Sequence, residues 1–168
     1  MVYDTEVPLR IERLPLVRPR KALALCDPPS GSVMLLTEAL ARGIVHGGCS
    51  IDILPTSEWE PGKMSGRQLL VVGAMDQYYG LSEGVRQFLD RMAVGSMKGK
   101  HGFAFDVRSS KHVLASAGGI LEKRMEECGM WIAMGHVYAL LDKKTGRLEE
   151  GGEERFEALG QTLAKRVW

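Results

Sequence analysis

Short apolar segments alternate with amphipathic segments along this chain, and the alternation constrains the fold more than any other feature. The apolar segments have the length of strands and carry few charges, as is typical of strands buried on both faces. We expect strands at residues 21–26, 50–54, 68–73, 102–107 and 131–141. Parallel strands need long crossovers, which are usually helices. The pattern therefore predicts an α/β fold with three layers around a doubly wound, five-stranded parallel sheet.

Four amphipathic segments, at residues 33–45, 82–92, 113–128 and 153–167, repeat apolar residues every three to four positions. This period is that of a helix with one buried face. The expected faces are Val33, Leu36, Leu40, Ala41 and Ile44; Val85, Phe88, Leu89 and Met92; Leu114, Ala117, Leu121 and Met125; and Phe156, Leu159, Leu163 and Val167.

Composition excludes several classes of protein. The chain has 168 residues, 45% of them hydrophobic, which suits a single domain with one sizeable core. Its 22 Lys and Arg balance 21 Asp and Glu, so charge does not indicate a nucleic-acid partner. The sequence has no apolar run long enough to span a membrane and no signal peptide, so we expect no membrane partner and a cytoplasmic location.

Cysteine and histidine usage argues against metal sites. The three cysteines are widely spaced without a C-x-x-C motif, which disfavours both a disulfide framework and a zinc site. We expect Cys26 and Cys128 to be packing residues. The four histidines lack the spacing of metal ligands, and no residue is assigned as a general acid or base.

The chain is expected to divide into an N-terminal arm at residues 1–20 and a domain at residues 21–168. Prolines at positions 8, 15 and 19 favour an extended arm over a helix. Its apolar residues predict packing against the domain or across a subunit boundary in a homo-oligomer, with disorder as the alternative. Trp59 and Tyr79 are the aromatic anchors expected at such an interface.

The turn at residues 27–33 links the first strand to the first helix and has the chemistry of a phosphate site. Such a turn directs backbone amides and the positive end of the helix dipole at one point. Ser30 and Ser32 add hydroxyl groups, and Gly31 permits a tight turn close to a ligand. The alternative is that Gly and Ser only turn the chain and cap the helix.

Two later loops are expected at the same edge of the sheet. The first spans residues 74–80 and contains a methionine and two tyrosines, whose faces suit a planar ring. Its alternative is a loop folded on its own apolar residues. The second spans residues 106–112 and is rich in hydrogen-bonding groups, with a solvated connector as the alternative.

These loops resemble those of a known family. Residues 27–33, DPPSGSV, are similar to the phosphate-binding segment D-S-x-T-G-N-T of flavodoxin-like proteins, and residues 73–82, GAMDQYYGLS, resemble the G-S-P-x-Y-x-G segment of that family. A K-G-K sequence at residues 98–100 and Gly129 also match its pattern. The resemblance covers the chain from Lys21 onward and is to proteins of the FMN-binding flavodoxin or NAD(P)H-dependent FMN reductase type.

The resemblance implies an FMN cofactor and a role in electron transfer or flavin-dependent reduction, with a redox partner protein or a small-molecule electron acceptor. Whether the chain is an FMN-dependent oxidoreductase is left open. The cofactor-binding residues that it implies are Ser30, Gly31, Ser32, Val33, Ala74, Met75, Asp76, Gln77, Tyr78, Tyr79, Asp106, Val107, Arg108 and Ser109.

The chain also departs from the family pattern. Pro28 and Val33 replace hydroxyl residues of the phosphate segment, which removes donors for a phosphate. Trp59 is expected at the surface or in an interface, with stacking on the flavin as the alternative. A flavin-free domain that binds a protein or an anion is therefore the alternative function.

Two other classes of enzyme or signalling domain share this topology and are disfavoured. A receiver domain needs an acidic cluster and a lysine after the last strand, where this chain has MGHVYALL. A low-molecular-weight tyrosine phosphatase needs an arginine shortly after its cysteine, and none follows Cys26 at that spacing.

Overall fold

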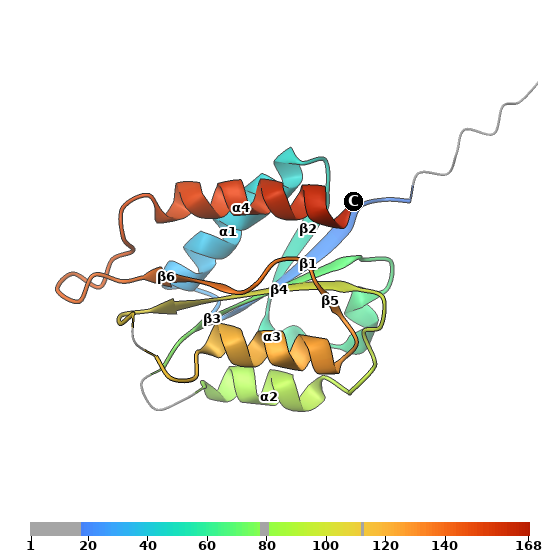
Figure 1. Cartoon of the computed structure of the whole chain (residues 1–168), viewed down its shortest axis with the longest axis horizontal. Helices are drawn as coiled ribbons and strands as arrows, with labels where there is room; N and C mark the ends of the chain where they lie inside the picture. Colours follow the sequence, from blue (N-terminus) through green and yellow to red (C-terminus); the bar gives the residue numbers. More distant parts are fainter. Residues whose placement is uncertain (1–17, 78–80, 112) are drawn as a thin grey trace, which may run out of the picture.

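The computed structural model describes residues 18–77, 81–111 and 113–168. A parallel sheet forms the middle layer, between α1 (Gly31–His46) with α4 (Gly152–Val167) and α2 (Glu83–Arg91) with α3 (Ala117–Glu127), as Figure 1 shows. The strands are β1 (Lys21–Asp27), β2 (Ser50–Pro55), β3 (Leu69–Met75), β4 (His101–Arg108), β5 (Trp131–Ile132) and β6 (Val137–Leu140). Two 3-10 helices, η1 (Thr56–Glu58) and η2 (Pro61–Met64), follow β2.

The sheet has the order β2-β1-β3-β4-β5, and β6 also pairs with β4. Every pairing between these strands is parallel. The predicted α/β class, the three layers and the doubly wound parallel sheet are thus confirmed.

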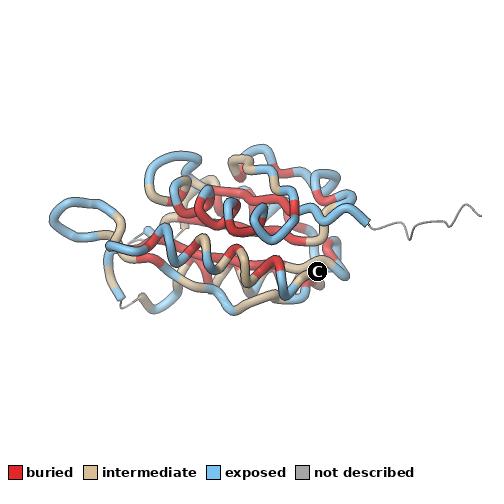
Figure 2. The backbone as a smooth tube through the Cα atoms, turned by 90° about the horizontal axis from the view of Figure 1, so that it is seen from above, coloured by how far each residue is buried: buried red, intermediate tan, exposed pale blue. Residues whose placement is uncertain are grey.

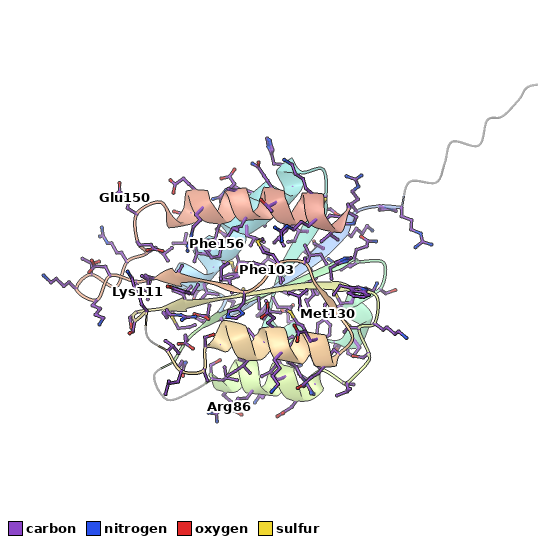
Figure 3. All side chains as sticks on the ribbon, viewed as in Figure 1. Arg86, Phe103, Lys111, Met130, Glu150 and Phe156 are labelled. Atoms are coloured by element: carbon purple, nitrogen blue, oxygen red, sulfur yellow. The ribbon has the colours of Figure 1, made fainter. Side chains whose placement is uncertain are left out.

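Side chains along each strand alternate between two cores because successive residues point to opposite faces. On β4, Phe103 and Phe105 face α1 and α4, whereas Ala104 faces α2 and α3. Phe105 meets Phe156 of α4 edge to face, with 5.0 Å between ring centroids. Figure 3 shows Phe103 and Phe156 between the sheet and α4. The strands and the inner helix faces are buried, and the loops at both ends are exposed (Figure 2).

The helices α1 and α4 approach each other closely at two glycines. A Cβ on Gly43 would lie 2.0 Å from the backbone oxygen of Glu157, and one on Gly160 would lie 2.1 Å from that of Leu40. No side chain fits at either position, so the two glycines set the distance between the helices.

The last predicted strand is interrupted, which corrects the expectation of one strand at residues 131–141. The structure has β5 and β6 instead, both paired with β4. Between them, the backbone amide of His136 donates to Glu122 of α3 at 2.9 Å. This contact holds the intervening segment on α3, away from the ladder.

Two further expectations need correction. The third helix begins at Ala117, after the N-cap Ser116, so Leu114 lies outside it and is fully exposed. Trp59 is buried in the core and meets Phe88 edge to face at 5.6 Å. Its burial rules out the expected surface position and a role as an interface anchor. The expected N-terminal arm lies outside the described residues except for residues 18–20, which are exposed.

Candidate functional site

Three loops meet at the carboxyl edge of the sheet because they follow three neighbouring strands. Loop 1 (residues 27–33) joins the end of β1 to the start of α1. Loop 2 (residues 74–82) contains the end of β3 and the segment after it, and loop 3 (residues 109–116) follows β4. Figure 3 shows Lys111 of loop 3 at the end of the sheet opposite Met130. Ligands of doubly wound folds bind at this edge. The sequence placed its candidate site in these loops, and the structure brings the three together.

Loop 1 leads into α1, and its polar groups are accessible to a ligand. Ser30 is exposed, and its hydroxyl makes no capping hydrogen bond. Gly31 has a φ of +62°, a conformation that favours glycine, and a Cβ there would meet no atom within 4 Å. Ser32 is half-buried, whereas the side chain of Val33 is buried in the core. Of Val33, only the backbone remains for a ligand.

Asp27 ends β1 and directs its carboxylate to the N-terminus of α2. The hydroxyl of Ser82, the N-cap of α2, donates to Asp27 Oδ2 and accepts from the amide of Val85 at 3.2 Å. A Cβ on Gly84 would lie 2.7 Å from Asp27 Oδ1, so glycine permits this approach. The carboxylate thus lies at the positive end of the α2 dipole.

Loop 2 begins with residues that belong partly to the core. Ala74 is buried on the side of α2 and α3, and Met75 packs against the core on the other side. Gln77 is exposed. Tyr78 and Tyr79, the residues expected to stack on a ring, lie outside the described residues.

The carboxylate of Asp76 accepts a hydrogen bond from the amide of Ala117, the first residue of α3, at 2.9 Å. Burial raises the pKa of Asp76 above its ordinary value of 3.8, the Ala117 amide opposes this shift, and Asp106 adds to it. Asp76 therefore stabilises the start of α3 at a cost in desolvation.

A buried ion pair underlies loop 3. Arg108 Nε and Nη2 donate to the two carboxylate oxygens of Asp106, at 2.7 and 2.8 Å. The guanidinium lies 4.0 Å from the centroid of the Tyr138 ring on β6. Asp106 also accepts from the amide of Gly118 at 3.0 Å. These contacts join β4, β6 and α3.

Asp106 and Arg108 are among the predicted cofactor residues, but their pairing was not predicted. Their spacing of two on a buried strand was the available signal, because it places both side chains on one face. Val107 points to the opposite core and is buried, so its side chain contacts protein. Ser109 is exposed at the start of loop 3.

The N-termini of the three helices at this edge differ. In α2, Ser82 caps the helix, and in α3 the amides of Ala117, Gly118 and Gly119 donate to Asp76, Asp106 and Ser116. In α1, no side chain of the described residues caps the first turn, and no acidic residue lies within that turn. Of these three helices, α1 is therefore the one whose first-turn backbone amides remain available to bind an anion.

A second polar pair lies beside loop 3. His136 Nδ1 is 2.8 Å from Glu122 Oε2. His136, Arg108 and Tyr138 line a cavity of about 560 Å³ together with residues of loop 3 and α3. No local sequence pattern indicates this cavity, because its walls come from three separate segments.

Within the described residues, no group of three or more His, Cys, Asp or Glu side chains could hold a metal ion. The three cysteines are buried and free, as expected for Cys26 and Cys128. Burial raises the pKa of the Cys26 thiol to about 11, and Asp27 and Glu38 add to the shift. Among the described residues, no helix has the length and apolar character needed to cross a membrane.

Comparison with known proteins identifies the fold. No protein-family model matches the chain, and no curated protein matches its sequence. Flavodoxin 2 from Bacillus cereus is similar in structure, with a TM-score of 0.75, 16% identity and coverage of 86% of this chain and 98% of that one. A flavodoxin from the domain Archaea has a TM-score of 0.69 and 20% identity, covering 88% of this chain and 98% of the other.

Part of a larger protein is also similar. Rubredoxin oxygen:oxidoreductase from Desulfovibrio gigas has a TM-score of 0.68 and 15% identity, and the match covers 89% of this chain but 37% of that one. The chain therefore has the flavodoxin-like fold, which confirms the resemblance at the level of the fold.

Proposed function

We propose that this protein binds FMN at the carboxyl edge of its sheet and takes part in electron transfer or flavin-dependent reduction. The observation that carries the proposal is the uncapped N-terminus of α1 in a flavodoxin-like fold. FMN supplies the redox chemistry when it is bound. The chain itself would bind and orient the cofactor.

The residues of loop 1 fit a phosphate with fewer donors than the family pattern offers. The hydroxyls of Ser30 and Ser32 and the amides of residues 30–33 remain. Pro28 and Pro29 have no amide, and Val33 has no hydroxyl. Each charge-assisted hydrogen bond to phosphate contributes about 1.5–3 kcal/mol, so we expect FMN to bind more weakly than with a full set of donors.

The negative charge of Asp27 would repel a phosphate in loop 1 less strongly than its position suggests. Its carboxylate accepts from Ser82 and lies at the N-terminus of α2, where the helix dipole offsets its charge. The first turn of α1 therefore keeps a favourable potential for an anion.

The ring of FMN is proposed to lie between loops 2 and 3. The residues assigned to it from the sequence are Ala74, Met75, Asp76, Gln77, Tyr78 and Tyr79 on one side, and Asp106, Val107, Arg108 and Ser109 on the other. Because the side chains of Ala74, Asp106 and Val107 are buried, we assign them a supporting role, through the backbone or through the residues that they hold.

In this proposal, the protein exchanges electrons with a redox partner protein or passes them to a small-molecule electron acceptor. The second candidate, a flavin-free domain that binds a protein or an anion, is favoured by the missing donors at Pro28 and Val33. The two candidates differ in whether FMN binds at all.

The test compares two glycines with the same backbone conformation. Gly31 and Gly146 have φ values of +62° and +68°, and a Cβ on either would meet no atom within 4 Å. Valine at either position would adopt the same left-handed backbone conformation, which costs about 1–2 kcal/mol. We expect Gly31→Val to weaken FMN binding about tenfold or more, measured by flavin fluorescence, because the loop amides shift.

Gly146→Val is the matched control, since residue 146 lies in the hairpin after β6, and it should bind FMN as the native chain does. Equal affinities of the native chain and Gly31→Val would show that loop 1 does not hold the phosphate. The absence of FMN binding by the native chain would favour the flavin-free candidate.

A further inference from the structure

Three segments converge at the amino edge of the sheet, opposite the loops described above. Residues 18–20, 66–68 and 98–100 directly precede β1, β3 and β4, which are neighbours in the sheet (Figure 1). The amide of Gln68 donates to the oxygen of Lys21 at 2.9 Å, and the amide of His101 donates to that of Gln68 at 2.8 Å. The three segments are therefore fixed side by side.

This edge concentrates positive charge in a chain that is almost neutral overall. Residues 18–21, 66–68 and 98–101 contain six basic residues and no Asp or Glu, whereas the whole chain has 22 Lys and Arg against 21 Asp and Glu. The six are Arg18, Arg20, Lys21, Arg67, Lys98 and Lys100. Clustered charge of one sign raises the local concentration of counter-charged ligands.

A cavity of about 550 Å³ lies between these segments. Among the described residues, its charged lining consists of Arg18, Lys98 and Lys100 and includes no carboxylate side chain. The Asp52 carboxylate is engaged by Arg67 at 2.6 Å. Three cations thus line one space, with no acidic residue among the described residues of its lining.

Hydrogen bonds fix the walls of the cavity. Lys100 Nζ donates to the backbone oxygen of Arg67 at 2.6 Å, which ties the segment before β4 to the one before β3. The Gln68 side chain accepts from the amide of Lys21 at 2.9 Å and from Trp168 Nε1 at 3.2 Å. Lys100 and Gln68 are therefore held in place before any ligand arrives.

Two glycines add backbone donors. Gly66 and Gly99 line the cavity with φ values of +73° and +83°, and a Cβ on either would meet no atom within 4 Å. Within the described part of the chain, neither amide has an acceptor. Free amides beside cationic side chains form a concave anion site.

We propose that this cavity binds a pyrophosphoryl group, either as free pyrophosphate or as part of a nucleoside di- or triphosphate. Its three cations match a ligand with several negative oxygens better than they match a monoanion. The strands β1, β3 and β4 have seven or eight residues, so the site lies roughly 23 Å from the carboxyl edge. It is therefore separate from the proposed FMN site and does not depend on it.

Isothermal titration calorimetry of the full chain with sodium pyrophosphate tests the proposal. We expect saturable binding that weakens with added salt, and an Arg18→Glu/Lys98→Glu variant whose Kd is about tenfold higher or more. Arg18→Gln/Lys98→Gln repeats the test without introducing negative charge. The matched control is Lys143→Glu/Lys144→Glu, which changes the net charge equally in the exposed hairpin after β6 and should bind like the native chain.

Parallel titrations with ADP, ATP and inorganic phosphate separate the sources of the ligand. Equal affinity for pyrophosphate and ATP supports recognition of the pyrophosphoryl group alone, and tighter binding of ATP supports a nucleotide. The proposal is overturned if pyrophosphate and ATP give no saturable binding, if inorganic phosphate binds as tightly as both, or if the control weakens binding as much as the Arg18→Glu/Lys98→Glu variant. Flavin fluorescence of the same samples reports FMN binding independently.

Discussion

Asp106 and Arg108 lie two residues apart on β4, and their charges are almost completely removed from water. The side chain of Asp106 is 0% exposed and that of Arg108 is 7% exposed. Such a pair contributes little net stability, but breaking it leaves one charge buried and unpaired. The pair has a structural role here, because it connects β4 to β6 through Tyr138 and to α3 through Gly118.

We expect Arg108→Met to lower the free energy of unfolding by about 3–5 kcal/mol, because Asp106 loses its partner. Urea unfolding followed by circular dichroism measures this change. The double variant Asp106→Asn/Arg108→Met should recover most of the loss, since the neutral amide can still accept from Gly118. Equal stability of Arg108→Met and the native chain would contradict this account of the pair.

The raised pKa of Asp76, which contacts the start of α3, predicts that the stability of the fold depends on pH. Burial raises its pKa above 3.8 in the folded chain, so the protonated form is favoured there. Its contribution to stability is fully present below 3.8 and is lost as the pH rises through the raised value. Asp76→Asn cannot ionise, so its stability relative to the native chain should increase over that pH range.

Unfolding of both proteins at a series of pH values checks the sign. If the native chain instead gains stability relative to Asp76→Asn as the pH rises, then the Ala117 hydrogen bond outweighs burial in setting the pKa of Asp76.

The carboxylates at the carboxyl edge have partners far away in the sequence. The sequence placed Asp27, Asp76 and Asp106 near one edge because each ends or follows an expected strand. Their partners could not be read from it. Asp27 meets Ser82 across 55 positions, and Asp76 meets Ala117 across 41, so these contacts depend on the folded sheet.

At the scale of elements, the contact between α1 and α4 depends on glycine. A Cβ on Gly160 would lie 2.1 Å from the Leu40 oxygen, and backbone cannot give way as a side chain can. We expect Gly160→Ala to destabilise the fold by about 1–3 kcal/mol, as overpacking does. Thermal unfolding measures the effect.

Gly152→Ala is the control on the same helix, because its nearest neighbour, Leu36 Cδ2, is 3.9 Å from the new Cβ. It should be neutral or slightly stabilising, since alanine favours a helix. A Gly160→Ala variant as stable as this control would show that α1 and α4 can separate at no cost.

Elements defined by periodicity were predicted well. The first helix was expected at residues 33–45 and spans Gly31–His46, and all five residues of its expected apolar face are buried. The division of the last strand was not predicted, because apolar residues lie on both sides of Gly135 and His136. The contact between His136 and Glu122, which lies in the gap between β5 and β6, joins separate elements.

At the scale of the whole molecule, the sequence also predicts a homo-oligomer with an N-terminal arm across the subunit boundary. That arm lies outside the described residues except for its last three, and Trp59 is excluded as an anchor by its burial. Deleting residues 1–18 is expected to lower the association constant in analytical ultracentrifugation while the domain stays folded. A native chain that sediments as a monomer at tens of micromolar would refute this prediction.

The two edges of the sheet carry different chemistry. The carboxyl edge has an uncapped α1 and carboxylates engaged by α2 and α3, whereas the amino edge has six basic residues. We therefore expect a monophosphate cofactor at the first edge and a pyrophosphoryl group at the second. These two expectations can fail independently.

The most direct test of the FMN proposal compares FMN with riboflavin, which has the same ring but no phosphate. Titration of each flavin with the native chain, followed by flavin fluorescence, should show saturable binding with FMN about tenfold tighter or more, because loop 1 donates to the phosphate. Binding of neither flavin, or equal affinity for both, would contradict a phosphate held at the N-terminus of α1.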